Sequence, residues 1–478
     1  MSGFYIEHFG CRAARADGEA IGARLAAAGL SERQPCEADV LVVNTCSVTA
    51  EADRQARAFI RRAHRQNPAA RILVTGCYAQ RAPDELSVIP GVSAVAGNSH
   101  KALVPQIALS LVGVSLAREL VQIAAMPVSP AMPQETTAPR QAAPPQVALV
   151  AVDDLFAHSF IEEPRLTPGA RTRPNLKIQE GCGNRCTLCV IPTTRGPSRS
   201  LPGAAVVRQV EGFIASGGNE LVLSGINLGR WGRDLPGDRF GTLAALVRHM
   251  LERTRLPRLR LSSIEPMDWD TDVIALLEEF AGPHSGTGRL ARHAHLPLQS
   301  GSDAVLRRMH RRYRPWHYVE KVQALLRATG SGLTIGADVM VGFPGETDAE
   351  FEETVAFIRS LPFGYLHLFP FSARPGTRGW HLHAESPVPA SAVHERMTAL
   401  RSLAAEKTRA HRTSFLSRDL DAITLHTPAE VASRNRTSAL SENFLPIEVD
   451  ASLPANQLLR VHVTGLDADS GLSGRKIA

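Results

Sequence analysis

The chain of 478 residues is too long for one ordinary hydrophobic core, so two to four domains are expected. Its 44% hydrophobic and 21% charged residues describe a soluble globular protein, and its net charge of +6 is only modestly basic. This charge suits a polyanionic partner but does not identify one, because many proteins that bind no nucleic acid are equally basic.

Seven cysteines, an odd number, and a start without a basic or apolar leader argue against a secreted, disulfide-bonded protein. We therefore expect a cytoplasmic protein whose cysteines serve metal binding or catalysis. Residues 102–117 are mostly apolar, but they are fewer than the ~20 residues of a membrane span and include Pro105 and Gln106. This stretch predicts a helix packed on the N-terminal domain, and no membrane attachment is expected.

Residues 1–101 alternate between strand and helix patterns, which predicts an open α/β sheet. Residues 40–44 and 71–75 are continuous apolar runs, as in parallel strands that are buried on both faces. The other expected elements are a strand over 4–9, an alanine-rich helix over 19–29 and a helix over 50–66 that Thr49 can cap.

Three cysteines, Cys11, Cys46 and Cys77, each follow one of the expected strands. In open α/β sheets, ligand sites form at the carboxyl ends of the strands. The three thiols are therefore expected to converge at one edge, although three unrelated buried cysteines would give the same pattern. Cys36 lies among polar residues before a strand and is interpreted as a bystander.

Residues 126–146 are rich in Pro, Ala, Gln and Thr, which predicts a linker or a disordered insertion that buries little surface. The expected domains are residues 1–125, a linker or insertion over 126–170, a central domain over 171–412 and a C-terminal domain over 413–478.

The central domain contains six strand-like runs separated by helical stretches, which predicts a (βα)₆ arrangement. These runs cover residues 176–178, 221–224, 258–261, 293–296, 333–339 and 365–369. After residue 412, short strands at 422–425, 444–449 and 458–463 predict a small antiparallel β-barrel.

Cys182, Cys186 and Cys189 follow the first of these six runs with the spacing C-x₃-C-x₂-C. Such a compact loop can point three thiolates at one centre, and thiolates select zinc, copper(I) or iron–sulfur clusters. Both a structural zinc site and an iron–sulfur cluster normally take four protein ligands. Three thiolates on a four-iron cluster leave one iron open for a small molecule. Zinc and three buried free cysteines remain the alternatives.

This cysteine loop resembles that of the radical S-adenosylmethionine (SAM) enzymes, whose partial (βα)₆ barrel agrees with the predicted central domain. The residues over 189–192, with Arg195-Gly196 and Arg199-Ser200, resemble the methylthiotransferases among them. Residues 44–49 and 74–80 are similar to the N-terminal domain of that family, in which three cysteines hold an auxiliary [4Fe–4S] cluster implicated in sulfur supply. The resemblance therefore implies two [4Fe–4S] clusters, one ligated by Cys182, Cys186 and Cys189 and one by Cys11, Cys46 and Cys77.

The resemblance also implies SAM contacts in the segments that follow the barrel strands. Leu188 stands where the family usually has an aromatic residue, and its backbone is expected to face the adenine. The segment after the second strand can approach SAM closely because it contains a glycine. The implied SAM-binding residues are Leu188, Ser224, Gly225, Asn227, Glu265, Gln299 and Asp338. No catalytic side chain beyond the cluster ligands is implied, and His293 and His295 are interpreted as strand histidines.

Two windows are strongly basic, residues 307–314 and the arginines of residues 54–65. Arginines can neutralise phosphates of a nucleic acid or form a solvated helix face. In the resembling family the C-terminal position holds a TRAM domain that grips tRNA, and residues 441–444 and 471–474 keep this resemblance.

Residues 50–54, 178–182 and 260–266 look most like the branch that modifies N6-threonylcarbamoyladenosine at position 37 of tRNA. The resemblance implies that a methylthio group is inserted at C2 of this base in the anticodon stem-loop. One SAM would donate the methyl group and a second would give a 5′-deoxyadenosyl radical. An electron donor such as a flavodoxin or ferredoxin, and a monomeric enzyme, are also implied. The alternatives are a sibling enzyme acting on isopentenyladenosine 37 or on a ribosomal-protein aspartate, and a non-catalytic RNA-binding protein with structural metal.

Overall fold

The structure is a computed structural model that describes residues 2–114, 148–160, 166, 172–281, 288–467 and 471–477. It divides into a first unit, residues 1–164 with 193–196, and a second unit, residues 165–192 with 197–478. The predicted linker over 126–146 lies outside the described residues. Within the described ranges, every helix is too short or too polar to span a bilayer.

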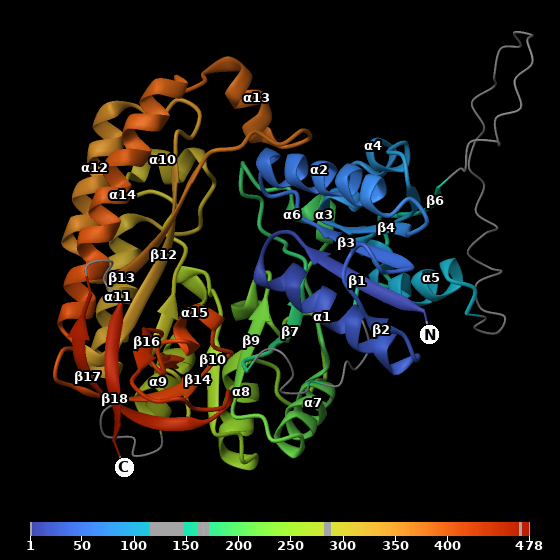
Figure 1. Cartoon of the computed structure of the whole chain (residues 1–478). Coiled ribbons are helices and arrows are strands. Elements are labelled where there is room, and N and C mark those ends of the chain that lie inside the picture. The colour runs from blue at the N-terminus through green and yellow to red at the C-terminus, as the bar shows by residue number, and fades with distance from the viewer. Residues whose placement is uncertain are drawn as a thin grey trace, which may run out of the picture. The chain divides into compact units, whose positions relative to one another are not determined.

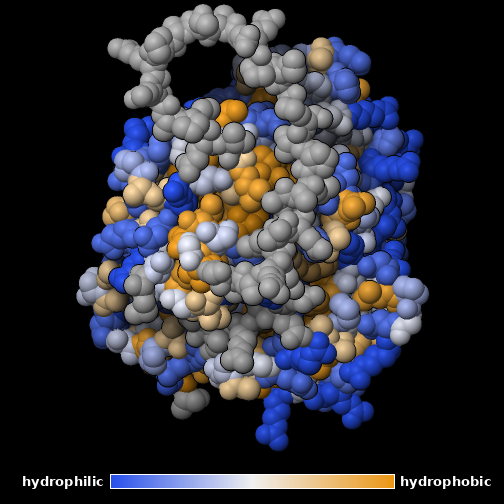
Figure 2. Space-filling view, turned by 90° about the vertical axis from the view of Figure 1, so that its right-hand side faces the viewer, coloured by the Kyte–Doolittle hydropathy of each residue, from blue (hydrophilic) through white to orange (hydrophobic). Residues whose placement is uncertain are grey.

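A parallel sheet with the strand order β2-β1-β3-β4-β5-β6 forms the centre of the first unit, which confirms the predicted open α/β sheet (Figure 1). Its strands are β1 (Gly3–His8), β2 (Ser31–Glu32), β3 (Val40–Thr45), β4 (Arg71–Gly76), β5 (Val92–Gly97) and β6 (Leu149–Ala151). Strand β6 comes from residues that the sequence placed in the linker or insertion. Its Leu149 and Val150 are exposed at the sheet edge, and Figure 2 shows apolar surface on this side of the molecule.

Alternate residues of β3 face two separate hydrophobic cores. Val40 and Val42 share a core with α1 (Arg12–Ala27) and α5 (Val104–Leu111), whereas Leu41 and Val43 share another with α2 (Ala50–Gln66). Burial on both faces explains the continuous apolar run in the sequence.

Helix α1 begins at Arg12 and not at residue 19, so the predicted start of this helix was wrong. The alanines Ala13, Ala14 and Ala16 are already buried as helical residues, and the helix starts directly after Cys11. Two short helices, α3 (Cys77–Arg81) and α4 (Pro83–Ser87), follow β4.

The second unit contains the six predicted barrel strands, whose mutual pairings are parallel. One sheet has the order β10-β9-β7-β8 and the other has the order β11-β12-β13. A parallel bridge between Leu259 and Leu290 links the edge of the first sheet to the segment before β11. The six barrel strands are β7 (Asn175–Glu180), β9 (Glu220–Gly225), β10 (Arg258–Leu261), β11 (His293–His295), β12 (Thr334–Val341) and β13 (Phe363–Pro370). The short strand β8 (Arg199–Ser200) is an additional strand at the edge of the first sheet. His293 and His295 are strand residues, as predicted.

Helices cover these strands and share one hydrophobic core with them. The helices are α7 (Gly203–Ala215), α8 (Leu243–Arg253), α9 (Thr271–Ala281), α11 (Pro315–Thr329), α12 (Asp348–Ser360) and α14 (Ala390–Thr413). Figure 1 shows α12 and α14 alongside β12 and β13, and Ile358 of α12 and Leu400 of α14 belong to the shared core. The partial (βα)₆ barrel is thereby confirmed.

The C-terminal residues form a closed barrel with the order β14-β15-β16-β18-β17. Its strands are β14 (Asp419–Thr424), β15 (Thr437–Ser441), β16 (Pro446–Val449), β17 (Leu458–Leu466) and β18 (Leu472–Ile477). The predicted small barrel is confirmed, but the expectation of purely antiparallel pairing was wrong, because β16 and β18 run parallel. Five strands cannot alternate in direction around a closed ring, so at least one neighbouring pair must be parallel.

The turn that follows β15 attaches this small barrel to the remainder of the second unit. The backbone carbonyl of Ser441 accepts a hydrogen bond from Arg260 at 3.1 Å, and Glu442 forms an ion pair with Arg292. The guanidinium of Arg260 also lies 5.4 Å from the ring centre of Phe444. These contacts give residues 441–444 a structural role.

A buried carboxylate stands at the start of β9, at the opposite end of the strands from the cysteine loop. Glu220 pairs with Arg260 at 2.9 Å, Arg173 at 3.2 Å and Arg258 at 3.4 Å. Burial alone would raise the pKa of Glu220, but the three guanidinium groups outweigh it and lower the pKa to about 2. Glu220 is therefore ionised at neutral pH.

Candidate functional site

The loop that carries Cys182, Cys186 and Cys189 begins where β7 ends. Backbone N–H groups of the loop donate to two of its sulfurs, from Asn184 to Cys182 at 3.4 Å and from Ile191 to Cys189 at 3.4 Å. The bond from Ile191 lowers the pKa of the Cys189 thiol and so favours the thiolate, which is the form that binds metal.

Contacts from outside the loop fix its position. The backbone N–H and the hydroxyl of Thr187 donate to the carbonyls of Met309 at 3.1 Å and Arg308 at 2.7 Å. In return, the backbone N–H of Gly379 donates to the Thr187 carbonyl at 2.8 Å. Because Thr187 lies between the second and third cysteines, these bonds limit the movement of both.

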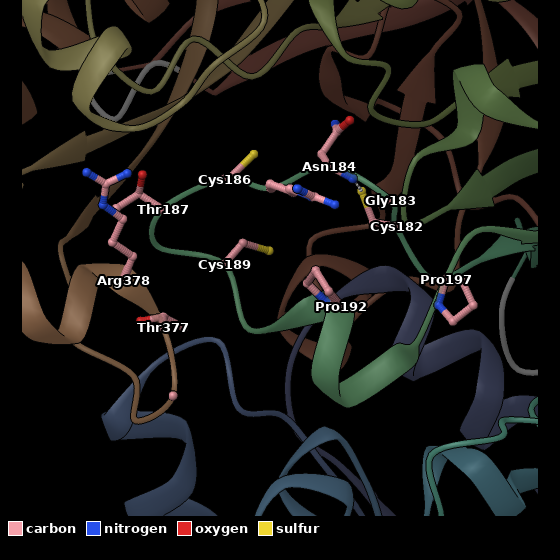
Figure 3. A pocket seen from close by; sticks show the side chains of 12 residues that line it. Cys182, Gly183, Asn184, Cys186, Thr187, Cys189, Pro192, Pro197, Thr377 and Arg378 are labelled. Carbon is pink, nitrogen blue, oxygen red and sulfur yellow. Dashed lines mark hydrogen bonds between the residues drawn. The ribbon is translucent and has the colours of Figure 1, made fainter.

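A cavity of about 430 Å³ opens beside the loop, which is a size typical of small-molecule sites. Figure 3 shows the three cysteines on the loop, with Thr377 and Arg378 on a separate segment. The lining residues are Cys182, Gly183, Asn184, Arg185, Cys186, Thr187, Cys189, Pro192, Pro197, Gly376, Thr377 and Arg378.

A buried arginine stands next to this loop. Arg311 donates to the Cys186 sulfur at 3.3 Å and contacts both carboxylate oxygens of Glu265 at 2.8 and 2.9 Å. In the sequence, Arg311 is one member of a basic window, and its contact with Cys186 was not predicted. No signal in the sequence separates it from the neighbouring arginines.

Burial raises the pKa of the Cys189 thiol to about 12 and also raises the pKa of the Cys186 thiol. A thiol with the pKa of Cys189 is protonated at neutral pH. A metal centre displaces that proton when it binds. The thiol loop therefore fits a metal cluster.

The predicted SAM-binding residues lie at the barrel strands, outside the lining of the cavity. Ser224, Gly225 and Asn227 are at the end of β9, Glu265 follows β10, Gln299 follows β11 and Asp338 is in β12. Two of them contact the thiol loop or its arginine, because Asn227 donates to Cys182 at 3.7 Å and Glu265 binds Arg311. Leu188 packs against an apolar cluster that includes Met309.

Two buried amide oxygens in this group have no hydrogen-bond partner among the described residues, Asn227 Oδ1 and Gln299 Oε1. Gln299 also has a backbone φ of 64°, a conformation that is uncommon for residues other than glycine. Its backbone is held there by bonds with Asp338 and Met340 of β12. A buried acceptor without a donor is unfavourable, so both amides suit a ligand that brings donors, as the amino group of SAM does.

Two glycines bring the N-terminal cysteines together in the first unit. Gly10 has φ +105°, and a Cβ atom there would lie 2.4 Å from the Cβ of Cys46. Gly76 has φ +100°, and its Cβ would lie 2.2 Å from the carbonyl oxygen of Thr45. Each glycine therefore allows a strand end that carries a cysteine to approach the end of β3 closely.

The N-terminal thiols also influence one another electrostatically. Burial, with added repulsion from Cys77 and Cys11, raises the pKa of the Cys46 thiol to about 12. The Cys77 sulfur accepts hydrogen bonds from Arg195 at 3.2 Å and from Asn98 at 3.4 Å. The backbone N–H of Val48 donates to the Cys46 sulfur at 3.5 Å. The structure thus places three thiols at one edge of the sheet, with donors aimed at two of them.

In the part of the chain that the structure describes, no three His, Cys, Asp or Glu side chains gather closely enough to hold one metal ion. A single zinc ion needs such a compact ligand set. In a four-iron cluster each thiolate binds a different iron, so the ligands stand farther apart.

The two basic windows differ in their surroundings. In residues 307–314, Arg307 pairs with Asp303, Arg308 with Glu350 and Arg312 with Asp268. These three arginines are thus paired with carboxylates, although Arg307 and Arg312 are exposed. On α2, the side chains of Arg54, Arg61, Arg62 and Arg65 are exposed, and Arg54 pairs with Glu51.

Two family models match the chain. Residues 3–97 match the uncharacterized protein family UPF0004, and residues 176–358 match the radical SAM superfamily. The chain is 34% identical over 444 residues to the threonylcarbamoyladenosine tRNA methylthiotransferase MtaB of Bacillus subtilis (strain 168). That match covers 92% of this chain and 88% of the relative.

A second relative is the tRNA-2-methylthio-N(6)-dimethylallyladenosine synthase of Cereibacter sphaeroides. It is 29% identical over 482 residues, which cover 99% of this chain and 98% of the relative. Among solved structures, the radical S-adenosylmethionine methyltransferase TsrM from Kitasatospora setae matches with a TM-score of 0.48 and 14% identity. That match covers 77% of this chain and 75% of the TsrM chain.

Proposed function

This chain belongs to the radical SAM methylthiotransferases, and we propose that it inserts a methylthio group at C2 of N6-threonylcarbamoyladenosine 37 of tRNA. The relative from Bacillus subtilis, which carries this activity in its name, is 34% identical over most of both chains. The observation that carries the proposal is the presence of two separate cysteine triads, each at the carboxyl ends of parallel strands and each with hydrogen bonds to its sulfurs.

We assign Cys182, Cys186 and Cys189 to one [4Fe–4S] cluster and the remaining triad to a second. The remaining triad consists of Cys11, Cys46 and Cys77. When bound, the first cluster would pass one electron from an external donor to SAM, which would break a C–S bond to give methionine and a 5′-deoxyadenosyl radical. The C2–H bond of adenine is too weakly acidic for a general base to remove its proton. Radical chemistry is therefore required to replace this hydrogen with sulfur.

We propose that the protein's own residues position SAM. We assign Asn227 and Gln299 as polar contacts to SAM because their buried oxygens offer acceptors. Arg311 places a buried cation between Cys186 and Glu265, where it can orient an anionic group. The other proposed contacts are Leu188, Ser224, Gly225, Glu265 and Asp338.

For the tRNA, we propose that the exposed arginines of α2 contact backbone phosphates of the anticodon stem-loop. Arg61, Arg62 and Arg65 are the members of this group that follow one another on the last turns of the helix. A tRNA substrate implies a cytoplasmic enzyme, and the reaction implies an electron donor such as a flavodoxin or ferredoxin.

Expression in a bacterial strain that lacks its own methylthiotransferase for this base tests the proposal. Nucleosides from digested tRNA would be measured by mass spectrometry. We expect 2-methylthio-N6-threonylcarbamoyladenosine to appear with the unaltered chain and not with Cys186→Ala. Methylthiolation of isopentenyladenosine alone would show that the chain shares the activity named for the Cereibacter sphaeroides relative.

A further inference from the structure

A short segment of the chain belongs to the first unit, although it follows the loop that carries Cys182, Cys186 and Cys189, here called the SAM-cluster loop. Residues 193–196 pack with residues 1–164, although the sequence on both sides belongs to the second unit. Asn98 holds this piece in place, because its side-chain amide donates to the Thr194 carbonyl at 2.8 Å and to the Cys77 sulfur at 3.4 Å.

The side chain of Arg195, in this segment, is fully buried. Its Nε donates to the Cys77 sulfur at 3.2 Å, and its Nη1 lies 3.3 Å from the carboxylate of Asp17. Lys101, which is also fully buried, binds the same carboxylate at 2.7 Å. Arg195 and Lys101 both bind the Asp17 carboxylate. This pairing holds the Arg195 guanidinium in the orientation that reaches Cys77.

The chemistry of this contact is specific to arginine. A guanidinium remains charged under all conditions in a protein and forms strong hydrogen bonds to ionised acceptors. Hydrogen bonds to the sulfurs and nearby charge are two of the factors that set the reduction potential of an iron–sulfur cluster. A buried cation favours the reduced cluster, which carries one more negative charge, over the oxidised one.

We propose that Arg195 is a positioning residue for the site formed by Cys11, Cys46 and Cys77, where it fixes the Cys77 sulfur and raises the reduction potential of the cluster. This inference rests on the proposed function, because it takes the N-terminal triad as a cluster site. It adds a role for a residue outside both triads.

The test uses a parent variant in which Cys182, Cys186 and Cys189 are all changed to Ala, so that only the N-terminal cluster is assembled under exclusion of oxygen. Iron content and the midpoint potential, from a redox titration followed by electron paramagnetic resonance, are measured in this parent. Arg195→Gln is expected to shift the one-electron reduction equilibrium about tenfold toward the oxidised form, which is about 59 mV. Arg195→Lys keeps the charge but loses the planar guanidinium, so its midpoint potential should lie between that of the parent and that of Arg195→Gln.

The matched control is Arg57→Gln. Arg57 is also in the first unit and donates to the Tyr78 hydroxyl at 2.6 Å, but it touches no cysteine. Its substitution should leave the midpoint potential of the parent unchanged.

An Arg195→Gln protein that binds its iron fully and keeps the parent's midpoint potential overturns the inference. If Arg195→Gln loses its iron, Arg195→Lys decides the matter. The midpoint potential of iron-loaded Arg195→Lys must lie below that of the parent, and an unchanged or higher potential also overturns the inference. Absence of iron in the parent itself would contradict the proposed second cluster instead, so the two failures are distinguishable.

Discussion

Glu220→Ala should lower the free energy of unfolding of the second unit by about 3–5 kcal/mol, because it leaves the buried Arg258 and Arg260 without their carboxylate. The lowered pKa of Glu220 gives a similar contribution to the free energy of unfolding. Its value of about 2, against the ordinary 4.5, corresponds to about 3 kcal/mol at 1.36 kcal/mol for each pKa unit.

The same contact predicts how stability depends on pH. The pKa of Glu220 is lower in the folded than in the unfolded protein, so its contribution is complete above pH 4.5. This contribution is lost as the pH falls from 4.5 toward 2. The difference in stability between the unaltered protein and Glu220→Ala should therefore shrink over that range.

Urea unfolding followed by tryptophan fluorescence measures this effect in one unit. The four tryptophans, Trp231, Trp269, Trp316 and Trp380, all belong to the second unit, so the signal reports its unfolding alone. Glu252→Ala is a matched control, because Glu252 forms a partly exposed pair with Arg248 and should contribute less than about 1 kcal/mol. A loss below 1 kcal/mol in Glu220→Ala would refute the assignment of a tightly held buried carboxylate.

Four further substitutions test the two triads and Arg311. Cys186→Ala should abolish formation of 5′-deoxyadenosine from SAM. Cys46→Ala should still form some 5′-deoxyadenosine but no methylthio product. Normal product from Cys46→Ala would reject a role for the N-terminal triad. Gly10→Ala forces a side chain into a left-handed backbone next to Cys46, so iron content should fall toward that of one cluster, and full iron content would contradict the packing. Arg311→Met removes the guanidinium that contacts both oxygens of the Glu265 carboxylate. SAM binding, measured by equilibrium dialysis, should then weaken at least tenfold, and an unchanged affinity would contradict this.

The fold was predictable where the sequence pattern reports burial directly. The apolar runs that became β3 and β4 are covered by helices on both faces, and this is the arrangement that such runs indicate. The start of α1 was missed because its first turns are buried through alanines, which give a weak hydrophobic signal. The parallel pairing of β16 with β18 follows from closing a ring of five strands, a property that no single strand reveals.

The site was predictable to the extent that its chemistry is local in sequence. The spacing of Cys182, Cys186 and Cys189 identifies a three-thiol loop by itself, whereas Cys11, Cys46 and Cys77 required the topology of the sheet. The partners of the sulfurs were not predictable. Arg195 and Arg311 reach their cysteines over separations of more than one hundred residues, and many arginines of the chain look the same in sequence.

The return of residues 193–196 to the first unit has a consequence for biosynthesis. A ribosome releases the chain from its N-terminal end, and domains usually complete their folding in that order. Here the sheet with its three cysteines emerges well before Thr194 and Arg195 do, so the nascent unit stays unfinished until the SAM-cluster loop has also been made. The first unit with its Arg195 contact can therefore be completed only after residues 193–196 have left the ribosome.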